Sequence, residues 1–136
     1  MFPIKATRKA NAAEDLDGSY RTGSGLMLKE QWCDLILQGL KTWELRRKNC
    51  SKHGKFFLVK CGSKKVFGEA VLFEPKEVTW TELAANVDKH CVPMNDLKEM
   101  KYSKYLAWQL KDVVEYKDPV TVKHVACVFK TQVRQS

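Results

Sequence analysis

Three charged side chains lie close together in the sequence and could form one site. Lys41, Glu44 and Arg46 all fall in the segment GLKTWELR, and on an extended strand Glu44 and Arg46 share one face. A carboxylate there can accept hydrogen bonds from an exocyclic amine or an amide edge. A guanidinium can donate two parallel bonds to a phosphate or a base edge. The Lys41 ammonium, at the turn before the strand, can reach toward a phosphate.

A simpler interpretation of the same residues is structural. Glu44 and Arg46 could form an exposed cross-strand ion pair, which contributes only about 0–1 kcal/mol to stability. The residue types alone do not separate this interpretation from a ligand site.

The elements around the three charges follow from hydrophobic spacing. Residues 26–28 form a short apolar strand, and Trp32, Leu35 and Ile36 recur at helical spacing, which predicts a helix over 31–38. Gly39 suits the left-handed turn that ends a helix. Residues 42–47 then form a strand whose Trp43 faces away from Glu44 and Arg46.

The remainder of the chain alternates short strands with two helical excursions. We expect strands over 56–61, 66–73, 105–116 and 125–133, with Pro75 and Pro119 ending the strands before them. Gly68 is expected at a bulge or a close approach. Thr79 or Thr81 caps a helix that runs to about residue 89, and Asp96 caps a second one that runs to about residue 100. This pattern predicts an α+β barrel of five to six strands decorated by short helices.

The segment from Gly39 to Arg46 resembles the G-x-K-x-x-E-x-R signature of the ASCH domain family, within the PUA-like superfamily. The flanks agree, with the Lys29 to Trp32 helix entry before the signature and the WQLKDV segment from Trp108 after it. The resemblance covers about residues 25–133. It implies a PUA-like barrel with a cleft beside the first helix, where the Lys, Glu and Arg of the signature bind RNA or nucleotide-like ligands. Residues 1–24 are polar, rich in Gly, Ser, Ala and Asn and without periodicity, and we expect them to form a flexible N-terminal arm.

The favoured function is therefore a module that holds single-stranded RNA or an unpaired or modified base in this cleft. Trp32 or Trp108 could stack a base, which is worth about 1–3 kcal/mol. Core packing is the more ordinary role for Trp32. The candidate ligand-binding residues are Lys29, Trp32, Gly39, Lys41, Thr42, Glu44, Arg46, Lys60 and Trp108.

The positive charge is unevenly distributed and suits a polyanion. Residues 41–65 hold nine basic residues and one acid, which equals the whole net charge of +8. A solvated lysine face is the alternative explanation. The basic residues expected to follow an RNA backbone are Arg47, Lys48, Lys52, Lys55, Lys64 and Lys65.

Catalysis is a second possibility, with Lys41 and Glu44 as the candidate groups. Relatives that hydrolyse an acetylated cytidine place a Thr three residues after the signature Lys, where this chain has Glu44, so that activity lacks its hydroxyl. Glu44 could instead act as a general base in metal-independent RNA cleavage, or Glu69 could complete a carboxylate–lysine pair. We expect a binding protein rather than an enzyme.

A protein-interaction module, as in coactivator relatives, is the third possibility. Trp80, Leu83 and Val87 have the i, i+3, i+7 spacing of one helix face, which also suits ordinary packing onto the barrel.

The remaining features set broad limits. The chain has five cysteines, an odd number, and they are widely spaced, which favours reduced thiols over a set of disulfide bonds. Cys50 and His53 lack a second ligand pair for zinc, so we expect neither a metal nor a cofactor. The sequence shows neither a signal peptide nor an apolar span, so we expect a protein of the cytoplasm or nucleus that binds no membrane. We also expect a monomer whose partner is RNA or another protein.

Overall fold

The structure is a computed structural model that describes residues 8–10, 24–49, 53–121 and 126–128. Its strands are β1 (Arg8–Ala10), β2 (Ser24–Leu28), β3 (Trp43–Arg46), β4 (Gly54–Lys60), β5 (Lys65–Val78), β6 (Tyr105–Thr121) and β7 (Ala126–Val128). Its helices are α2 (Glu30–Leu37), α3 (Trp80–Ala85), α4 (Val87–His90) and α5 (Met94–Met100).

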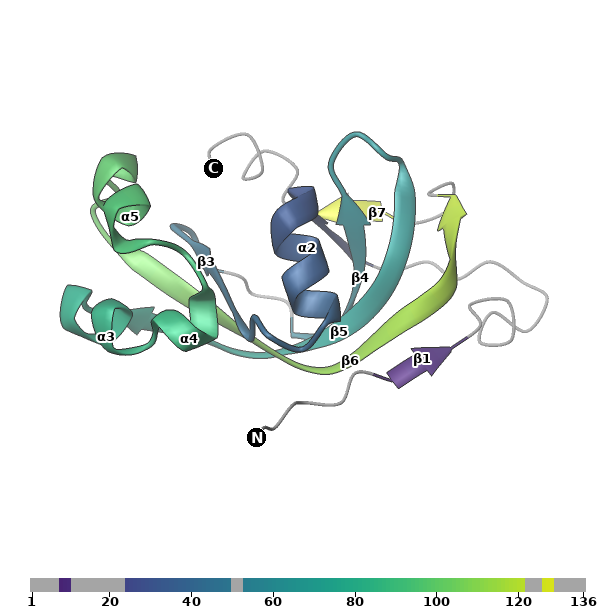
Figure 1. Cartoon of the computed structure of the whole chain (residues 1–136), viewed down its shortest axis with the longest axis horizontal. Coiled ribbons are helices and arrows are strands. Elements are labelled where there is room, and N and C mark those ends of the chain that lie inside the picture. The colour runs from purple at the N-terminus through teal and green to yellow at the C-terminus, as the bar shows by residue number, and fades with distance from the viewer. Residues whose placement is uncertain (1–7, 11–23, 50–52, 122–125, 129–136) are drawn as a thin grey trace.

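The strands form one strongly curled mixed sheet, an incomplete barrel that wraps around α2 (Figure 1). The strand order is β1-β6-β5-β4-β2-β7, with β3 paired to β6 off this path. Helices α3, α4 and α5 gather at the far end of the long β5–β6 hairpin. The predicted α+β barrel with short helices is thereby confirmed, with seven strands in the described part of the chain where five to six were expected.

Strand β6 organises the sheet because it pairs along both of its edges. One edge pairs with β5 from Tyr105 to Thr121. The other edge pairs with two short strands. Strand β3 is antiparallel to it over Leu106 to Gln109, and β1 is parallel to it over Val114 to Tyr116. The signature strand β3 is therefore fixed against the first half of β6.

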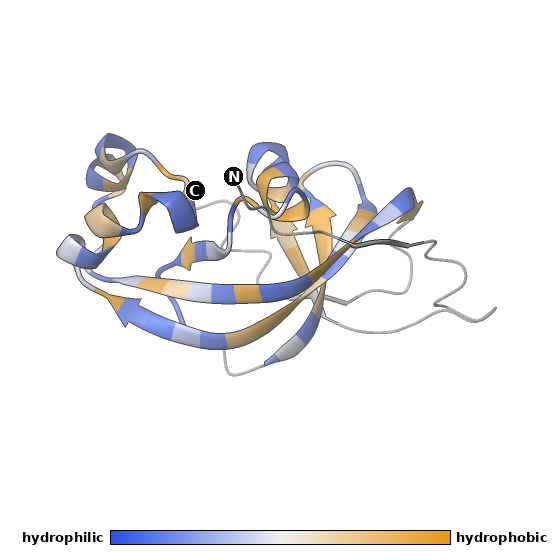
Figure 2. Cartoon of the chain, turned by 60° about the horizontal axis from the view of Figure 1, so that its bottom comes forward, coloured by the Kyte–Doolittle hydropathy of each residue, from blue (hydrophilic) through white to orange (hydrophobic). Residues whose placement is uncertain are grey.

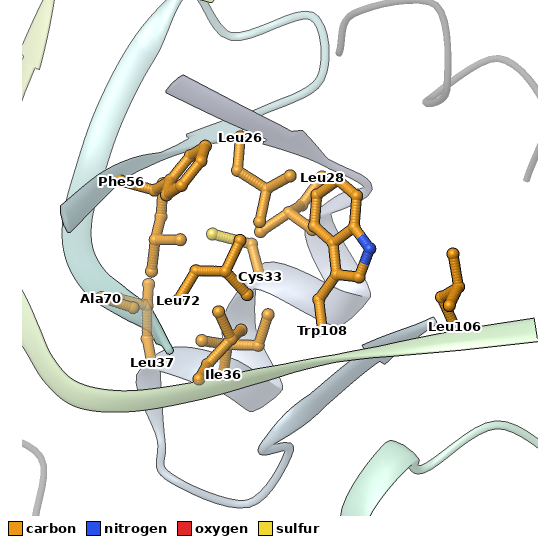
Figure 3. Packing of buried hydrophobic residues seen from close by; sticks show 12 residues of the cluster. Leu26, Leu28, Cys33, Ile36, Leu37, Phe56, Ala70, Leu72, Leu106 and Trp108 are labelled. Atoms are coloured by element: carbon orange, nitrogen blue, oxygen red, sulfur yellow. The ribbon is translucent and has the colours of Figure 1, made fainter. Parts of the chain in front are cut away.

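The main core lies between α2 and the curled sheet. Along β5 and β6 hydrophobic and hydrophilic residues alternate in patches, as expected for strands with one buried face (Figure 2). Figure 3 shows Cys33 and Ile36 of α2 packed against Leu28 and Trp108. Cys33 is fully buried, and this burial raises the pKa of its thiol to about 12, so it behaves as an inert core residue.

Two predicted strand ends are wrong, because β5 continues through Pro75 and β6 through Pro119. The pairing of β4 with β5 ends at Leu72, so Pro75 faces a paired strand on one side only among the described residues. Pro119 falls where the β5–β6 register shifts between Val66 and Gly68. A missing N–H is tolerated at an open edge and at a bulge.

The helical excursions also differ in detail from the prediction. Thr79, rather than Thr81, is the cap, and it forms a capping box with Glu82. The single helix expected to run to residue 89 is two helices, α3 and α4, divided at Asn86. Helix α5 begins at Met94 directly after Pro93, so Asp96 lies within its first turn instead of capping it.

The ends of the predicted domain are only partly described. Arg8–Ala10 pair with β6, and most of the arm predicted over 1–24 lies outside the described residues, so the arm stays a prediction. Of the predicted last strand over 125–133, Ala126–Val128 form β7 and the rest lies outside the described residues. None of the described helices is long and apolar enough to span a bilayer.

Gly68 is confirmed at both a register shift and a close approach. A Cβ atom there would lie 2.3 Å from the Val114 carbonyl oxygen and 2.7 Å from Cδ2 of Leu37. Gly62, in the β4–β5 turn, has open space around it but a φ of +81°.

These two glycines give a stability prediction. Gly68→Ala should lower the free energy of unfolding by about 3 kcal/mol, because a backbone carbonyl cannot move aside without breaking the β5–β6 pairing. Gly62→Ala should cost only about 1–2 kcal/mol, from left-handed strain alone. Urea unfolding of both variants measures the difference, and equal losses would contradict the close approach.

Candidate ligand site

The turn after α2 places the signature lysine. Gly39 has a φ of +80°, the left-handed conformation expected at the end of the helix. The chain then enters β3 through Thr42, whose N–H donates to the Lys89 carbonyl and whose own carbonyl accepts from the Leu110 N–H. Backbone bonds to α4 and β6 thus hold Lys41 and Glu44 at fixed positions.

The three signature charges meet in one cluster. Glu44 lies between the two cations: its Oε2 accepts from Arg46 Nε at 2.8 Å, and its Oε1 lies 3.7 Å from Lys41 Nζ. Glu44 and Arg46 share a face of β3, as alternation predicted, while Trp43 packs into a separate core on the opposite side. The cluster carries one net positive charge when Lys41 is protonated.

The cluster is buried, so the exposed ion-pair interpretation is wrong. Lys41, Glu44 and Arg46 are 2%, 6% and 5% exposed. The pair is also formed within β3 rather than across strands. Removing charges from water costs several kcal/mol per ion, which surface pairs avoid. A buried group of charges therefore calls for partners that satisfy each of them.

One guanidinium nitrogen of Arg46 lacks an acceptor among the described residues. Its Nη2 donates to the Met27 carbonyl at 3.1 Å, and its guanidinium carbon lies 5.5 Å from the centre of the Trp108 ring. Its Nη1 is buried and has no hydrogen-bond partner in the part of the chain that the structure describes. Buried donors are rarely left without an acceptor, so this N–H is a candidate contact for a ligand oxygen.

Lys41 has a different environment. Its Nζ donates to the His90 carbonyl at 2.5 Å and lies 4.8 Å from the centre of the Trp32 ring. Burial lowers the pKa of the ammonium from its ordinary value, and the neighbouring Glu44 carboxylate opposes that shift. The Lys41 ammonium therefore loses its proton more easily than that of an exposed lysine.

Two adjoining pockets give access to this region. The inner one is lined by Lys41 and Glu44 and holds about 30 Å³, too little for a nucleobase. The outer one holds about 280 Å³ between the first turn of α2 and α5. Trp32 and Met100 line both pockets, so these two side chains stand between the outer pocket and the charged cluster.

The other predicted ligand-binding residues are dispersed. Trp108 is fully buried and donates to the Lys48 carbonyl, so its ring supports Arg46 and is not exposed for stacking. Lys60 binds Asp34 at 2.7 Å and lies over the Phe67 ring, which fixes α2 to β4. Trp32 is half-buried, and Lys29 lines the outer pocket beside it.

The basic residues of 41–65 do not form one patch. Lys55 lies near the start of β4, whereas Lys64 directly precedes β5 and Lys65 is its first residue, about 20 Å away along the strand. Lys55 also pairs with Glu69 at 3.3 Å. Lys52 lies outside the described residues, and Arg47 lies over the Tyr102 ring.

The alternative catalytic carboxylate is elsewhere. Glu69 accepts from the Tyr116 hydroxyl at 2.7 Å, and its lysine partner is Lys55 rather than Lys41. The predicted interaction face on α3 and α4 is only partly exposed. Leu83 is fully buried, as expected for packing onto the barrel, whereas Trp80 and Val87 are 49% and 37% exposed.

His90 is the site residue that sequence reasoning missed. It is fully buried, its carbonyl accepts from Lys41, and its ring bridges Leu83 and Val92. Because the Val92 N–H donates to Nδ1, the ring is neutral with its proton on Nε2, which faces the Leu83 carbonyl at 2.8 Å. No sequence signal links His90 to Lys41, since 49 residues separate them.

The buried carboxylate gives a direct stability test. Glu44→Ala should lower the free energy of unfolding by about 3–5 kcal/mol at neutral pH, because it leaves two buried cations without their counter-ion. Lys55→Ala, which breaks a half-exposed pair, is the matched control and should cost less than about 1 kcal/mol. Similar losses in urea unfolding would mean that the cluster is not desolvated.

His90 gives a pH prediction. Burial lowers the pKa of its imidazole, and the nearby Lys41 ammonium adds to that shift, while the hydrogen bond to Leu83 and the Asp88 carboxylate oppose it. A histidine with a lowered folded pKa stabilises the fold above its unfolded pKa, and this contribution is lost as the pH falls below about 6.5.

The melting temperature of the wild type should therefore fall more between pH 7.5 and pH 5.5 than that of His90→Gln, which keeps a donor and an acceptor but cannot be protonated. The other histidines are common to both proteins, so the difference isolates His90. Parallel pH profiles would contradict a neutral, buried imidazole.

Comparison with known proteins gave no matching family model and no curated protein of similar sequence. Among solved structures, the ASCH protein of Zymomonas mobilis is 15% identical, with a TM-score of 0.62 over 82% of this chain and 92% of that chain. Two mutants of the same protein are 17% and 18% identical, each with a TM-score of 0.62 over 73% of this chain and 74% or 76% of theirs. The chain therefore has the fold of an ASCH domain, as the segment from Gly39 to Arg46 predicted.

Proposed function

We propose that this protein binds RNA or a nucleotide-like ligand at the Lys41–Glu44–Arg46 cluster. The observation that carries the proposal is the buried Arg46 Nη1, a cationic donor without an acceptor among the described residues. Placed in a cluster of net positive charge, it favours a ligand that brings an acceptor oxygen or negative charge. A phosphate oxygen or a base carbonyl meets that requirement.

The fold supports the same ligand class. ASCH domains are a family suggested to bind RNA, and the resemblance of Gly39 to Arg46 to their signature implies that the same three charged residues contact it. The identity of 15–18% carries the fold alone, so the ligand rests on the cluster and the resemblance together.

The two pockets suggest how a base would enter. A base in the outer pocket can stack on Trp32, whose ring already faces Lys41 Nζ on the inner side. Deeper entry requires Trp32 or Met100 to move, because the inner cavity of about 30 Å³ is far smaller than a base. Binding is thus expected to order this pair of side chains.

Hydrolysis at the same cluster is the alternative, and one observation favours it. Burial lowers the pKa of Lys41, which raises the fraction of neutral amine that could accept a proton from a nucleophile. Binding nevertheless explains the unpartnered Arg46 donor without a further assumption. Product analysis on a gel separates the two functions, because only an enzyme shortens the RNA.

The test is titration of a fluorescent single-stranded RNA trimer into the wild type and Arg46→Lys. The substitution keeps the charge but removes the planar fork, so the affinity should fall about tenfold or more while the salt dependence stays nearly unchanged.

Lys65→Met, at the distant start of β5, is the control and should bind the trimer like the wild type. Equal trimer affinity for the wild type and a folded Arg46→Lys protein would remove the cluster as the binding site.

A further inference from the structure

A larger hollow lies beyond the two pockets of the signature site. It holds about 770 Å³ between the end of β5, the start of α3 and the connection from α5 to β6, a size typical of ligand pockets. Figure 1 shows these elements gathered at one end of the molecule, away from the β4–β5 turn. Its floor is apolar, with Val78, Leu83 and Leu97 buried beneath it.

The rim of this groove is basic and aromatic. Lys98, Lys101 and Lys104 recur every third residue and are all exposed, and Glu77 is the one acid among the lining residues. Trp80 lies on the rim with about half of its surface exposed. The Thr79–Glu82 capping box fixes the turn that presents this tryptophan. An exposed aromatic ring beside a row of cations is the arrangement that binds single-stranded nucleic acid by stacking and charge.

The groove also adjoins the signature site. Leu97, Tyr102 and Tyr105 line both the groove and the inner pocket that contains Lys41 and Glu44. The Arg47 guanidinium lies 5.6 Å from the centre of the Tyr102 ring, so another cation marks the boundary between the two. Leu97 and Tyr105 are buried, so a strand would pass from the outer pocket to the three lysines over α5, whose residues line both hollows.

We propose that this groove is the extension of the RNA site, where Lys98, Lys101 and Lys104 contact backbone phosphates and Trp80 stacks a base. The inference rests on the proposed function and names its ligand as a strand several nucleotides long rather than a mononucleotide. The contacts to the RNA backbone are then made at α5 and the α5–β6 connection, rather than by the dispersed lysines of 41–65. Three lysines on one rim can contact successive phosphates, which Lys55 and Lys64 at opposite ends of β4 cannot.

The experiment compares an RNA trimer with a mixed-sequence RNA 12-mer at several salt concentrations. The wild type should bind the 12-mer more tightly. Replacing Lys98, Lys101 and Lys104 by Gln should remove most of that gain and reduce the salt slope by about two, since each phosphate contact on a single strand contributes about 0.7. The same variant should bind the trimer like the wild type.

Two further variants separate stacking from charge. Trp80→Leu should weaken 12-mer binding at least about fivefold without changing the salt slope, because stacking releases no counter-ions. Phe73→Leu is its control, since Phe73 is another half-exposed aromatic on β5 with Lys111 over its ring, but lies outside the groove.

The charge control replaces Lys64, Lys65 and Lys117 by Gln, three exposed lysines toward the other end of the β5–β6 hairpin. An equal drop in salt slope for this control would overturn the groove assignment, because any three lysines would then serve.

The outcomes for the two proposals differ. If Arg46→Lys weakens the trimer but the groove variants bind the 12-mer like the wild type, the groove inference fails and the proposed function stands. If the groove variants weaken the 12-mer while Arg46→Lys changes nothing, the RNA site is in the groove and the signature cluster is structural. If the wild type binds neither RNA, both proposals fail, and an acidic protein segment becomes the occupant to seek.

Discussion

The buried Glu44 carboxylate, held between Lys41 and Arg46, is the interaction on which the rest of the site depends. Three charges in the interior are costly unless each has a partner, and their partners come from elements far apart in sequence. Lys41 binds the carbonyl of His90 in α4, and Arg46 binds the carbonyl of Met27 in β2. The cluster thus links helix α4 to the sheet. The cluster has a net positive charge, and Arg46 Nη1 has no hydrogen-bond partner in the described part of the chain; the proposed ligand site rests on these two features.

The side chains around the cluster leave only a small interior cavity beside it. Trp32 and Met100 lie between the cluster and the outer pocket, and Trp108 fills the space under Arg46. Dry, low-dielectric surroundings strengthen every electrostatic contact made there, including one to a ligand. The same packing makes entry depend on side chains that must move. Affinity at this site is therefore expected to reflect both the strength of the charged contacts and the cost of opening the outer pocket.

The long β5–β6 hairpin determines where the two regions of interest lie. One end carries the β4–β5 turn and its lysines, and the other carries α3, α4 and α5 with their groove. The register shifts at Gly68 and beyond Glu69 bend the pair so that the sheet curls around α2. This curvature allows β3 to pair with β6 while its signature charges face the core. The lysines that are neighbours in sequence are consequently separated in space.

Local features were predictable from the residues alone: the turn at Gly39 after α2, the alternation that puts Glu44 and Arg46 on one face, and the tight approach at Gly68. These depend on backbone sterics and on neighbours within a few residues, which composition and spacing report directly. Other features became visible only in the folded chain: the burial of the three charges, the bond from Lys41 to the His90 carbonyl, the support of Arg46 by Trp108, and the strands that continue through Pro75 and Pro119. Burial and long-range pairing depend on which distant segments meet, and no local spacing contains that information.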